Sequence, residues 1–410
     1  MTAAVAIDAD RVIADLRELA RRTADEAGAQ RVAWTQPWHD ARAYLGELLD
    51  EIGASSEVDE AGNLWARLDG DAGPQAVAVG SHLDSVPGGG WLDGALGVMA
   101  GVGALRAYAQ EPSPRRPLAL VDWADEEGSR FGYSLYGSSA FAGELDARAV
   151  AELRDADGNS LRDVLAANDV DLDAASECSR RQADLGAYLE LHIEQGPVLE
   201  AEGVTVAAVD GCQGVERVRF RFTGQAAHAG TTPMGMRQDA GLAAAACALR
   251  VRHVADEHGG VATTGELRLV PGVSTAVAGE AALACDLRNA DPALLEVMLA
   301  DARAAAAECA REHRCEVGEE PVFRIAPTAF DPRLVEAAAA ACSEQVGSAY
   351  RITSGALHDA ANVARVLPAA MLFCPSIGGI SHANVEDTSE DHLKDAIEAF
   401  GLLVGKALAQ

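Results

Sequence analysis

The 410-residue chain lacks any apolar run long enough to cross a membrane. Its longest apolar stretches, at residues 241–249 and 368–375, fall well short of the roughly 18 residues that span a bilayer. The N-terminus also lacks the apolar core of a secretion signal and carries Asp8, Asp10 and Asp15 instead. We therefore expect a soluble cytoplasmic protein without a membrane partner.

Basic residues are scarce relative to acidic ones. The chain has 33 lysines and arginines against 63 aspartates and glutamates, which gives a formal charge of −30. A surface of this sign repels phosphate backbones and anionic membranes, so nucleic acid is not an expected partner.

Cysteine pairs of the C-x-x-C kind are absent, although the chain has eight cysteines. Scattered single thiols match neither a disulfide framework nor a cysteine zinc site, so we expect reduced and mostly buried thiols. No low-complexity tract or internal repeat interrupts the sequence. The length argues for two domains.

The first third of the chain alternates strands and helices, which is typical of α/β proteins. The expected helices lie at residues 11–20, 38–52 and 94–108, and the buried strands at 75–80, 117–123 and 187–193. Polar residues follow each strand, where open α/β sheets place their sites. The same sheet should be completed by a helix, a strand and a helix at residues 332–346, 369–374 and 391–409.

The middle of the chain has a different pattern. Residues 216–222 alternate between apolar side chains and arginines, as a half-exposed strand does. The following patterns predict the β-α-β-β-α-β order of a split ferredoxin-like unit, with elements at 239–257, 265–270, 280–288, 292–313 and 316–325. We predict a discontinuous α/β domain, residues 1–211 and 326–410, with an α+β domain inserted at 212–325.

A histidine and an aspartate directly follow the first strand. His82 and Asp84 belong to the segment GSHLDS, and Asp93 lies in the next glycine-rich turn. Imidazole and carboxylate are ligands for zinc and similar metals, and glycine lets the backbone pack close to an ion. A histidine that is simply hydrogen-bonded to an aspartate would leave the same pattern.

Four carboxylates lie within six residues at the end of the second strand: Asp122, Asp125, Glu126 and Glu127. They repel one another unless cations or solvent intervene, so a metal is a physical reason to hold them there. A solvated acidic loop is the alternative. His192 lies near the end of the predicted strand at 187–193, and His382 lies just beyond the one at 369–374. Together these side chains indicate a metal site at one sheet edge.

These motifs resemble those of the hydantoinase/carbamoylase amidases, a branch of the aminoacylase-like dinuclear zinc metallohydrolases. The resemblance covers nearly the whole chain, through residues 62–65, 80–94, 126–131, 191–196, 228–233, 354–360 and 381–382. It implies a mixed-sheet catalytic domain of the dinuclear zinc peptidase kind. The inserted domain would act as a lid and would join two subunits into a homodimer.

The resemblance also implies two divalent metal ions per subunit, Zn²⁺ or alternatively Mn²⁺, Co²⁺ or Ni²⁺. One ion would be held by His82, Asp93 and His192, and the other by Asp93, Glu127 and His382. Glu126 would be the general base that transfers a proton from water to the departing nitrogen. Asp84 would orient His82, while His358 and Asp359 would support the ligands from behind.

Substrate contacts follow from the same resemblance. His228 would stabilise the oxyanion across the dimer, Arg288 would bind a substrate carboxylate with both arms, and Gly379 would offer backbone contacts. Val215 stands where relatives carry a glutamine, and Thr275 where they carry an asparagine. The substrate's polar clamp therefore departs from the family pattern.

The implied reaction is hydrolysis of a linear amide C–N bond in a small ureido compound that carries a carboxylate. The altered clamp has fewer amide partners, which favours an N-carbamoyl-L-amino acid, cleaved to amino acid, CO2 and ammonia, over allantoate with its two ureido groups. Allantoate, an N-acyl amino acid and a dipeptide are the alternative substrates. A binding protein without chemistry is the alternative of a different class, and the intact Glu126 and ligand set oppose it.

Overall fold

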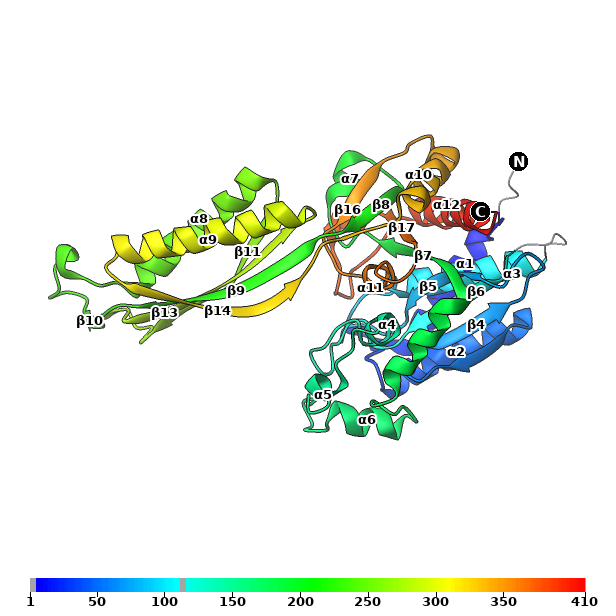
Figure 1. Cartoon of the computed structure of the whole chain (residues 1–410), viewed down its shortest axis with the longest axis horizontal. Helices are drawn as coiled ribbons and strands as arrows, with labels where there is room; N and C mark the ends of the chain where they lie inside the picture. Colours follow the sequence, from blue (N-terminus) through cyan, green and yellow to red (C-terminus); the bar gives the residue numbers. More distant parts are fainter. Residues whose placement is uncertain (1–4, 111–115, 410) are drawn as a thin grey trace. The chain divides into compact units, whose positions relative to one another are not determined.

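The computed structural model describes residues 5–110 and 116–409. It divides the chain into two compact units (Figure 1). Unit 1 comprises Met1–Gly211 and Ala329–Gln410, and unit 2 comprises Cys212–Thr328.

Unit 1 is built on a mixed sheet with the strand order β15-β8-β17-β7-β5-β6-β4-β3, and β16 pairs with β8. Strands β17, β7, β5 and β6 run parallel, whereas β8, β4 and β3 are antiparallel to their neighbours. The mixed α/β class predicted from the sequence is therefore confirmed. The bounds are β3 Ser55–Val58, β4 Leu64–Leu68, β5 Ala76–His82, β6 Leu118–Trp123, β7 Leu185–Ile193, β8 Ala207–Cys212, β15 Thr328–Ala329, β16 Arg351–Ser354 and β17 Ala369–Cys374.

Side chains of β7 alternate between two faces of this sheet. Leu189 and Leu191 belong to a large apolar core that they share with the long helices of unit 1. Tyr188, Glu190 and His192 alternate with them and are also buried. The long helices are α1 Ala9–Thr23, α2 Gln36–Ile52, α3 Ala95–Ala109, α10 Pro332–Val346 and α12 Glu390–Leu408.

Two glycines let the backbone approach the sheet edge. A Cβ on Gly80 of β5 would lie 1.9 Å from the carbonyl oxygen of Val121 on the adjacent β6. A Cβ on Gly94, which precedes α3 and has a φ of +64°, would lie 2.4 Å from the His82 ring. Glycine is needed at both points for steric reasons.

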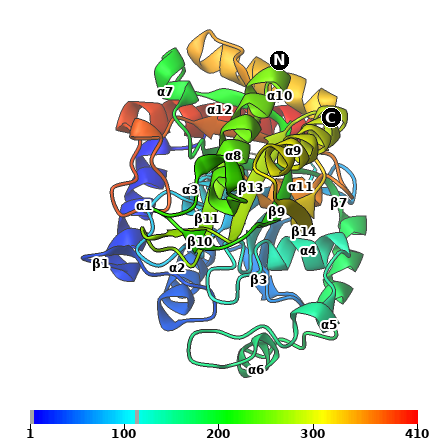
Figure 2. The same ribbon diagram turned by 90° about the vertical axis from the view of Figure 1, so that its left-hand side faces the viewer.

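Unit 2 has the element order β9-α8-β11-β13-α9-β14, and its sheet has the order β11-β13-β9-β14 with all neighbours antiparallel. Helices α8 and α9 pack side by side over the sheet (Figure 2). This is the split ferredoxin-like order. The bounds are β9 Gly214–Thr223, α8 Ala240–His258, β11 Val261–Val270, β13 Glu280–Asn289, α9 Pro292–Glu312 and β14 Glu316–Ile325.

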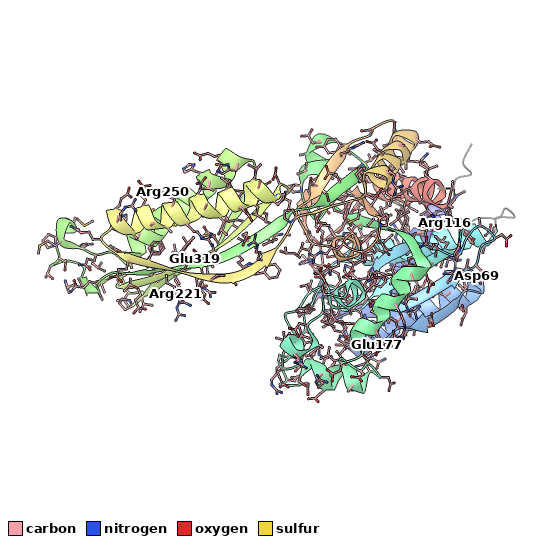
Figure 3. The ribbon with its side chains drawn as sticks, in the orientation of Figure 1. Asp69, Arg116, Glu177, Arg221, Arg250 and Glu319 are labelled. Carbon is pink, nitrogen blue, oxygen red and sulfur yellow. The ribbon has the colours of Figure 1, made fainter. Side chains whose placement is uncertain are left out.

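Charged pairs tie the outer surface of unit 2 together. Arg250 on α8 reaches Glu308 and Glu312 on α9, Arg221 on β9 reaches Glu320 on β14, and Arg303 on α9 pairs with Glu319 on β14. Figure 3 labels one member of each pair, Arg221, Arg250 and Glu319. These exposed pairs orient neighbouring elements and contribute little stability individually.

The shorter elements lie in the connections. They are β1 Ala24–Asp25, β2 Gly28–Ala29, α4 Tyr136–Ala142, α5 Ala147–Val150, α6 Leu161–Ala167, η1 Ala175–Asp184, α7 Val198–Glu202, β10 Ala227–His228, η2 Met234–Met236, β12 Ala276–Val277, α11 Asp359–Val363 and η3 Ile377–Gly379. Of the helices in the described ranges, none is both long and apolar enough to traverse a bilayer.

Candidate metal centre

The five expected ligands converge at one edge of the unit 1 sheet. His82 ends β5 and His192 lies next to the end of β7, while Glu127 and His382 follow β6 and β17. Asp93 lies in the loop between β5 and α3. Parallel strands end at the same edge, so residues far apart in the chain come together there.

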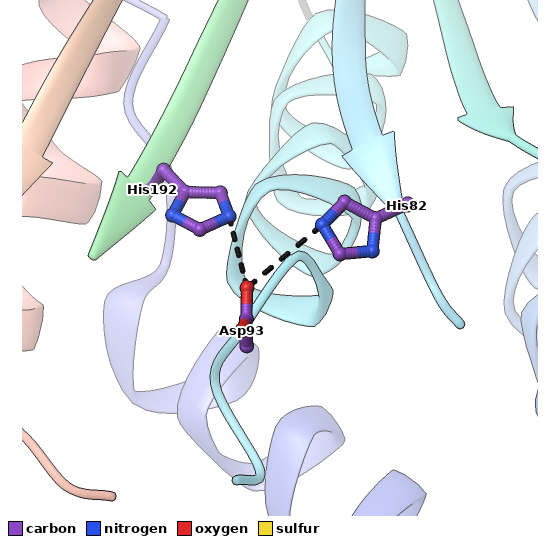
Figure 4. A group of neighbouring side chains, drawn as sticks. All are labelled: His82, Asp93 and His192. Atoms are coloured by element: carbon purple, nitrogen blue, oxygen red, sulfur yellow. Dashed lines mark ion pairs between the residues drawn. The ribbon is translucent and has the colours of Figure 1, made fainter. Parts of the chain in front are cut away.

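The first group is His82, Asp93 and His192, all buried (Figure 4). The Nε2 atoms of His192 and His82 lie 3.2 and 3.9 Å from Asp93 Oδ1. The Nδ1 atoms of the same rings face backbone carbonyl oxygens, 2.8 Å from Ile193 and 3.1 Å from Asp84. A carbonyl oxygen can only accept, so each Nδ1 donates and each Nε2 turns its lone pair towards this group.

The second group uses the other oxygen of Asp93. His382 Nε2 lies 3.3 Å from Asp93 Oδ2 and 3.5 Å from Glu127 Oε2. The Oε1 atom of Glu127 is buried and accepts no hydrogen bond from any residue that the structure describes. Asp93 therefore presents one oxygen to each group, which is how a bridging carboxylate is placed.

The electrostatics of both groups favour bound positive charge. The hydrogen bond to Asp93 raises the pKa of His382 to about 9, and burial together with Asp93 raises the pKa of Glu127 to about 7. Burial lowers the pKa of His82, but the Glu126, Asp84 and Asp93 carboxylates outweigh it and leave that pKa well above its usual value. Imidazole nitrogens and carboxylate oxygens in surroundings that favour positive charge are suitable ligands for zinc and related divalent ions.

Glu126 lies beside the groups without belonging to either. Its Oε2 is 3.7 Å from His82 Nε2, and the residue is 8 % exposed. Burial and the charges of Asp359, Glu127 and Asp84 raise its pKa well above the ordinary glutamate value. A carboxylate with this environment binds a proton more readily than a solvated glutamate.

The acidic segment that begins at the end of β6 is not a solvated loop. Asp122, Asp125 and Glu126 are all buried. Asp122 accepts from Arg42 Nε at 2.7 Å, and Asp125 accepts from Trp34 Nε1 at 3.4 Å. These two carboxylates have partners of their own, which separates them from the metal groups.

Asp84 makes stronger contacts with the backbone than with the His82 ring. Its carboxylate accepts from the backbone N–H groups of Glu126 and Glu127, both at 3.1 Å, whereas His82 Nδ1 is 3.6 Å from Asp84 Oδ1. The ring is instead held by the Asp84 carbonyl oxygen, because the chain turns directly after His82. Asp84 thus fixes the two glutamates as well as the imidazole.

His358 and Asp359 are buried behind His192. The rings of His358 and His192 lie 4.5 Å apart, and His358 Nε2 is 3.1 Å from Ser354 Oγ. Burial and the adjacent His192 lower the pKa of His358 well below its usual value. Both carboxylate oxygens of Asp359 are buried, and burial together with Glu190 raises the pKa of Asp359 well above its usual value.

A third group, Glu190, His192 and His358, is also close enough to hold an ion. However, the atoms that would bind the ion already have other contacts. The Glu190 carboxylate accepts from Ser81 Oγ at 2.6 Å and Tyr188 OH at 3.1 Å. His192 directs Nε2 towards Asp93, so this group is less suited to a metal than the first two.

Sequence patterns did not single out three side chains that surround the groups. Gln195 Nε2 donates to Asp93 Oδ2 at 3.0 Å, and the buried Glu386 accepts from the Asp93 backbone N–H at 3.0 Å. Arg31 is fully buried, and its two terminal nitrogens donate no hydrogen bond to any atom of residues 5–110 and 116–409. Burial lowers the Arg31 pKa, against the opposing effect of Asp93 and Asp84. A sequence signal existed only for Gln195, which lies three residues after His192.

The other expected contacts lie partly in unit 2. His228 and Thr275 come together there through the β10–β12 pair, with the Ala229 N–H donating to the Thr275 carbonyl oxygen at 2.9 Å. His228 Nδ1 accepts from the backbone N–H groups of Gly230 and Thr231, so Nε2 carries the ring proton.

Arg288 lies opposite Val215 on the neighbouring strand of unit 2, and its Nε donates to Asp286 Oδ1 at 2.8 Å. Val215 is buried. In unit 1, Gly379 has a φ of +65°, and a Cβ there would lie 2.8 Å from the Pro197 nitrogen.

Comparison with known proteins places this geometry in a family. The model of peptidase family M20/M25/M40 matches residues 78–406. The N-carbamoyl-L-amino-acid amidohydrolase of Paenarthrobacter aurescens is 35 % identical, with 98 % of each chain covered. The allantoate amidohydrolase of Bacillus subtilis is 33 % identical, with 93 % of each covered.

A solved structure gives the same result. The hydantoinase/carbamoylase family amidase from Burkholderia ambifaria superposes with a TM-score of 0.88 at 35 % identity over 99 % of both chains. The chain therefore belongs to the M20/M25/M40 peptidase family and, within it, to the hydantoinase/carbamoylase amidases, hydrolases of carbon–nitrogen bonds other than peptide bonds.

Proposed function

We propose that this chain is a dinuclear metal-dependent amidohydrolase that converts an N-carbamoyl-L-amino acid into the amino acid, CO2 and ammonia. The observation that carries the proposal is Asp93, which offers one oxygen to each of two ligand groups, with the buried Glu126 beside them. The similarity to N-carbamoyl-L-amino-acid amidohydrolases supports this substrate class.

The ligand sets are those inferred from the sequence. His82, Asp93 and His192 would hold one ion, and Asp93, Glu127 and His382 the other. When bound, two divalent ions would polarise the substrate carbonyl and lower the pKa of water.

Glu126 would move the proton. It would take a proton from the attacking water onto a carboxylate oxygen and deliver it to the departing nitrogen, so that one water is consumed for each C–N bond broken. Carbamic acid released in this way decomposes to CO2 and ammonia. The hydrogen bond from the Glu126 backbone N–H to the Asp84 carboxylate would hold Glu126 in place during both proton transfers.

Two side chains of unit 2 and one backbone group of unit 1 would bind the substrate. The Nε2–H of His228 would donate to the oxyanion, because backbone N–H groups already occupy its Nδ1. Arg288 would exchange its contact with Asp286 for the substrate carboxylate. Gly379 of unit 1 would contact the substrate through its backbone.

Allantoate is the second candidate substrate, favoured by the similarity to allantoate amidohydrolases. Val215 and Thr275 argue against it. A buried valine opposite Arg288 offers no amide to a second ureido group, and the Thr275 side chain offers one hydroxyl.

The test is a substrate panel with the metal-free protein reconstituted with Zn²⁺, Mn²⁺, Co²⁺ or Ni²⁺. N-carbamoyl-L-amino acids, allantoate, N-acetyl amino acids and dipeptides are incubated, and ammonia and free amino acid are quantified. We expect turnover of N-carbamoyl-L-amino acids and loss of activity with a chelator. Cleavage of allantoate alone would show that allantoate, and not an N-carbamoyl-L-amino acid, is the substrate. No turnover of any compound would refute the proposal that the chain is an enzyme.

A further inference from the structure

The hydroxyl group of Ser381 lies between two carboxylates. Its Oγ is 2.7 Å from Glu386 Oε2 and 3.3 Å from Asp93 Oδ2. The side-chain amide of Gln195 donates to Ser381 Oγ at 3.1 Å and to Asp93 Oδ2 at 3.0 Å. Four side chains from three loops therefore share one small polar network at the oxygen that faces the second ligand group.

Glu386 connects the loops that carry Asp93 and His382. It is 2 % exposed, and its Oε1 accepts from the backbone N–H groups of Asp93 at 3.0 Å and Leu92 at 3.3 Å. Its other oxygen accepts a hydrogen bond from the hydroxyl group of Ser381, the residue before His382. Gly90 makes room for this carboxylate, since a Cβ at Gly90 would lie 2.0 Å from Glu386 Oε1.

A serine hydroxyl has one proton to donate, so the two carboxylates compete for it. The shorter distance gives the proton to Glu386. Asp93 Oδ2 then accepts the Gln195 amide without the Ser381 proton, so its second lone pair is left for the side on which His382 lies. That oxygen is the one that lies 3.3 Å from His382 Nε2.

We propose that Glu386 is a positioning residue that draws the Ser381 proton away from Asp93 and so keeps Asp93 Oδ2 available to the second metal ion. The inference rests on the proposed metal function and adds a residue that acts through Ser381 and Asp93. Hydrogen-bond partners that orient ligands in this way typically change metal affinity about 10–100-fold when removed.

Glu386→Gln keeps the shape of the side chain but removes the carboxylate oxygen that accepts the Ser381 proton. The glutamine carbonyl would replace Oε1 as acceptor for the Leu92 and Asp93 N–H groups, which fixes its NH₂ group opposite Ser381. The amide would then donate to Ser381 Oγ, and the hydroxyl proton would turn to Asp93 Oδ2. We expect the affinity for one of the two ions to fall about 10–100-fold, with the other unchanged.

Removing the hydroxyl should reverse this loss. In Glu386→Gln combined with Ser381→Ala, no proton is available to occupy Asp93 Oδ2, so the second ion should bind within a few-fold of wild type. Asp15→Asn is the matched control, because Asp15 is also a buried carboxylate of unit 1 but contacts Arg11, Tyr44 and Arg106 instead of the site. It should bind both ions as wild type does.

The measurement is titration of the metal-free proteins with Co²⁺, followed by visible absorption and calorimetry, with urea unfolding as the check on folding. A second-site affinity in Glu386→Gln equal to wild type would overturn the inference, and so would a double variant as weak as the single one. Wild-type protein that binds two ions but hydrolyses nothing would refute the proposed function and leave the role of Glu386 standing. Wild type that binds fewer than two ions would overturn both.

Discussion

Glu126 and Glu127 are neighbours in sequence, yet their side chains have different surroundings. Glu127 lies against His382, whereas Glu126 lies against His82 and near the buried Asp359. The Asp84 carboxylate binds both backbone N–H groups and so fixes this difference. Glu127 is thereby placed among the expected ligands, and Glu126 is left for the proton transfers that we propose.

Glu126→Gln should abolish turnover without changing metal content. Glutamine fills the same space but cannot take up a proton, and general-base catalysis contributes about 10²–10⁴-fold to rate. We expect kcat to fall by that factor while the protein still binds two ions, measured by metal analysis and steady-state kinetics. An active variant would remove Glu126 from the proposed mechanism.

Thr275→Asn should shift substrate preference. Thr275 is exposed, so the substitution should leave folding intact. An added amide offers one more hydrogen bond, worth about 1 kcal/mol or roughly fivefold in affinity. We expect the KM for allantoate to fall by this factor relative to that for N-carbamoyl amino acids. Equal changes for both substrates would show that Thr275 does not contribute to specificity.

The sequence identified candidate ligands because they follow recognisable strands. His82, His192 and the glutamates after β6 lie where a buried apolar strand gives way to polar residues, and the structure brings them together. Glu386 and Arg31 have no such signature. Their contacts depend on how loops distant in the chain approach one another, which no local pattern encodes.

At the scale of elements, the ends of β5 and β6 depend on a close contact at Gly80. Gly80→Ala would place a Cβ against the Val121 carbonyl oxygen, so one strand must move. We expect a loss of about 1–3 kcal/mol in unfolding free energy, measured by urea denaturation. Gly46→Ala is the matched control in helix α2, where a Cβ meets nothing within 4 Å. It should stabilise the protein by up to about 1 kcal/mol.

The loop around Asp155 should weaken in acid. Partial burial acts to raise its pKa, but hydrogen bonds from Asn159 and the pair with Arg130 outweigh it and lower the pKa of Asp155 to about 2. Because the folded pKa lies below the ordinary 3.8, this stabilisation is complete above about pH 5 and is lost as pH falls towards 2.

Asp155→Asn tests that pH dependence. The difference in unfolding free energy between wild type and Asp155→Asn should be constant from pH 5 to 7 and should shrink below pH 4. Urea unfolding at several pH values measures it. A difference independent of pH would show that the charge of Asp155 does not stabilise the loop.

Periodic patterns predicted the long elements well and several short strands poorly. The helix at Pro332–Val346 and the strand at Ala369–Cys374 have the predicted bounds. Strands β3, β4, β8 and β16 were not predicted. They are four to six residues long, and their pairing depends on a neighbouring strand, so local sequence carries little signal for them.

At the scale of the whole molecule, two compact units divide the expected chemistry. All expected ligands and Glu126 belong to unit 1, while His228, Thr275 and Arg288 belong to unit 2. The order of unit 2 followed from alternating strand patterns and alanine-rich helices. Its role as a homodimer interface is a proposal, and it rests on the apolar side chains along one edge of its sheet.

Strand β11 forms that edge. Val261, Leu267, Leu269 and Val270 on β11 are 41–51 % exposed, and Leu249 on α8 is 69 % exposed. An unpaired edge strand with apolar side chains can pair with another chain, and an antiparallel pair of identical β11 strands satisfies twofold symmetry. We therefore expect a homodimer through β11, of twice the 42.6 kDa chain mass.

Leu267→Glu should separate the dimer, because a charge at the centre of the pair would be buried without a partner. Light scattering after size exclusion should give the single-chain mass for this variant. Val322→Glu is the control, since Val322 is 43 % exposed on β14 at the opposite edge of the same sheet, and it should stay dimeric. If His228 acts across the dimer, Leu267→Glu also loses turnover while retaining both metal ions. If Val322→Glu alone dissociates the dimer, the interface lies at β14 instead of β11. A monomeric wild type would show that neither edge of the sheet forms a dimer interface.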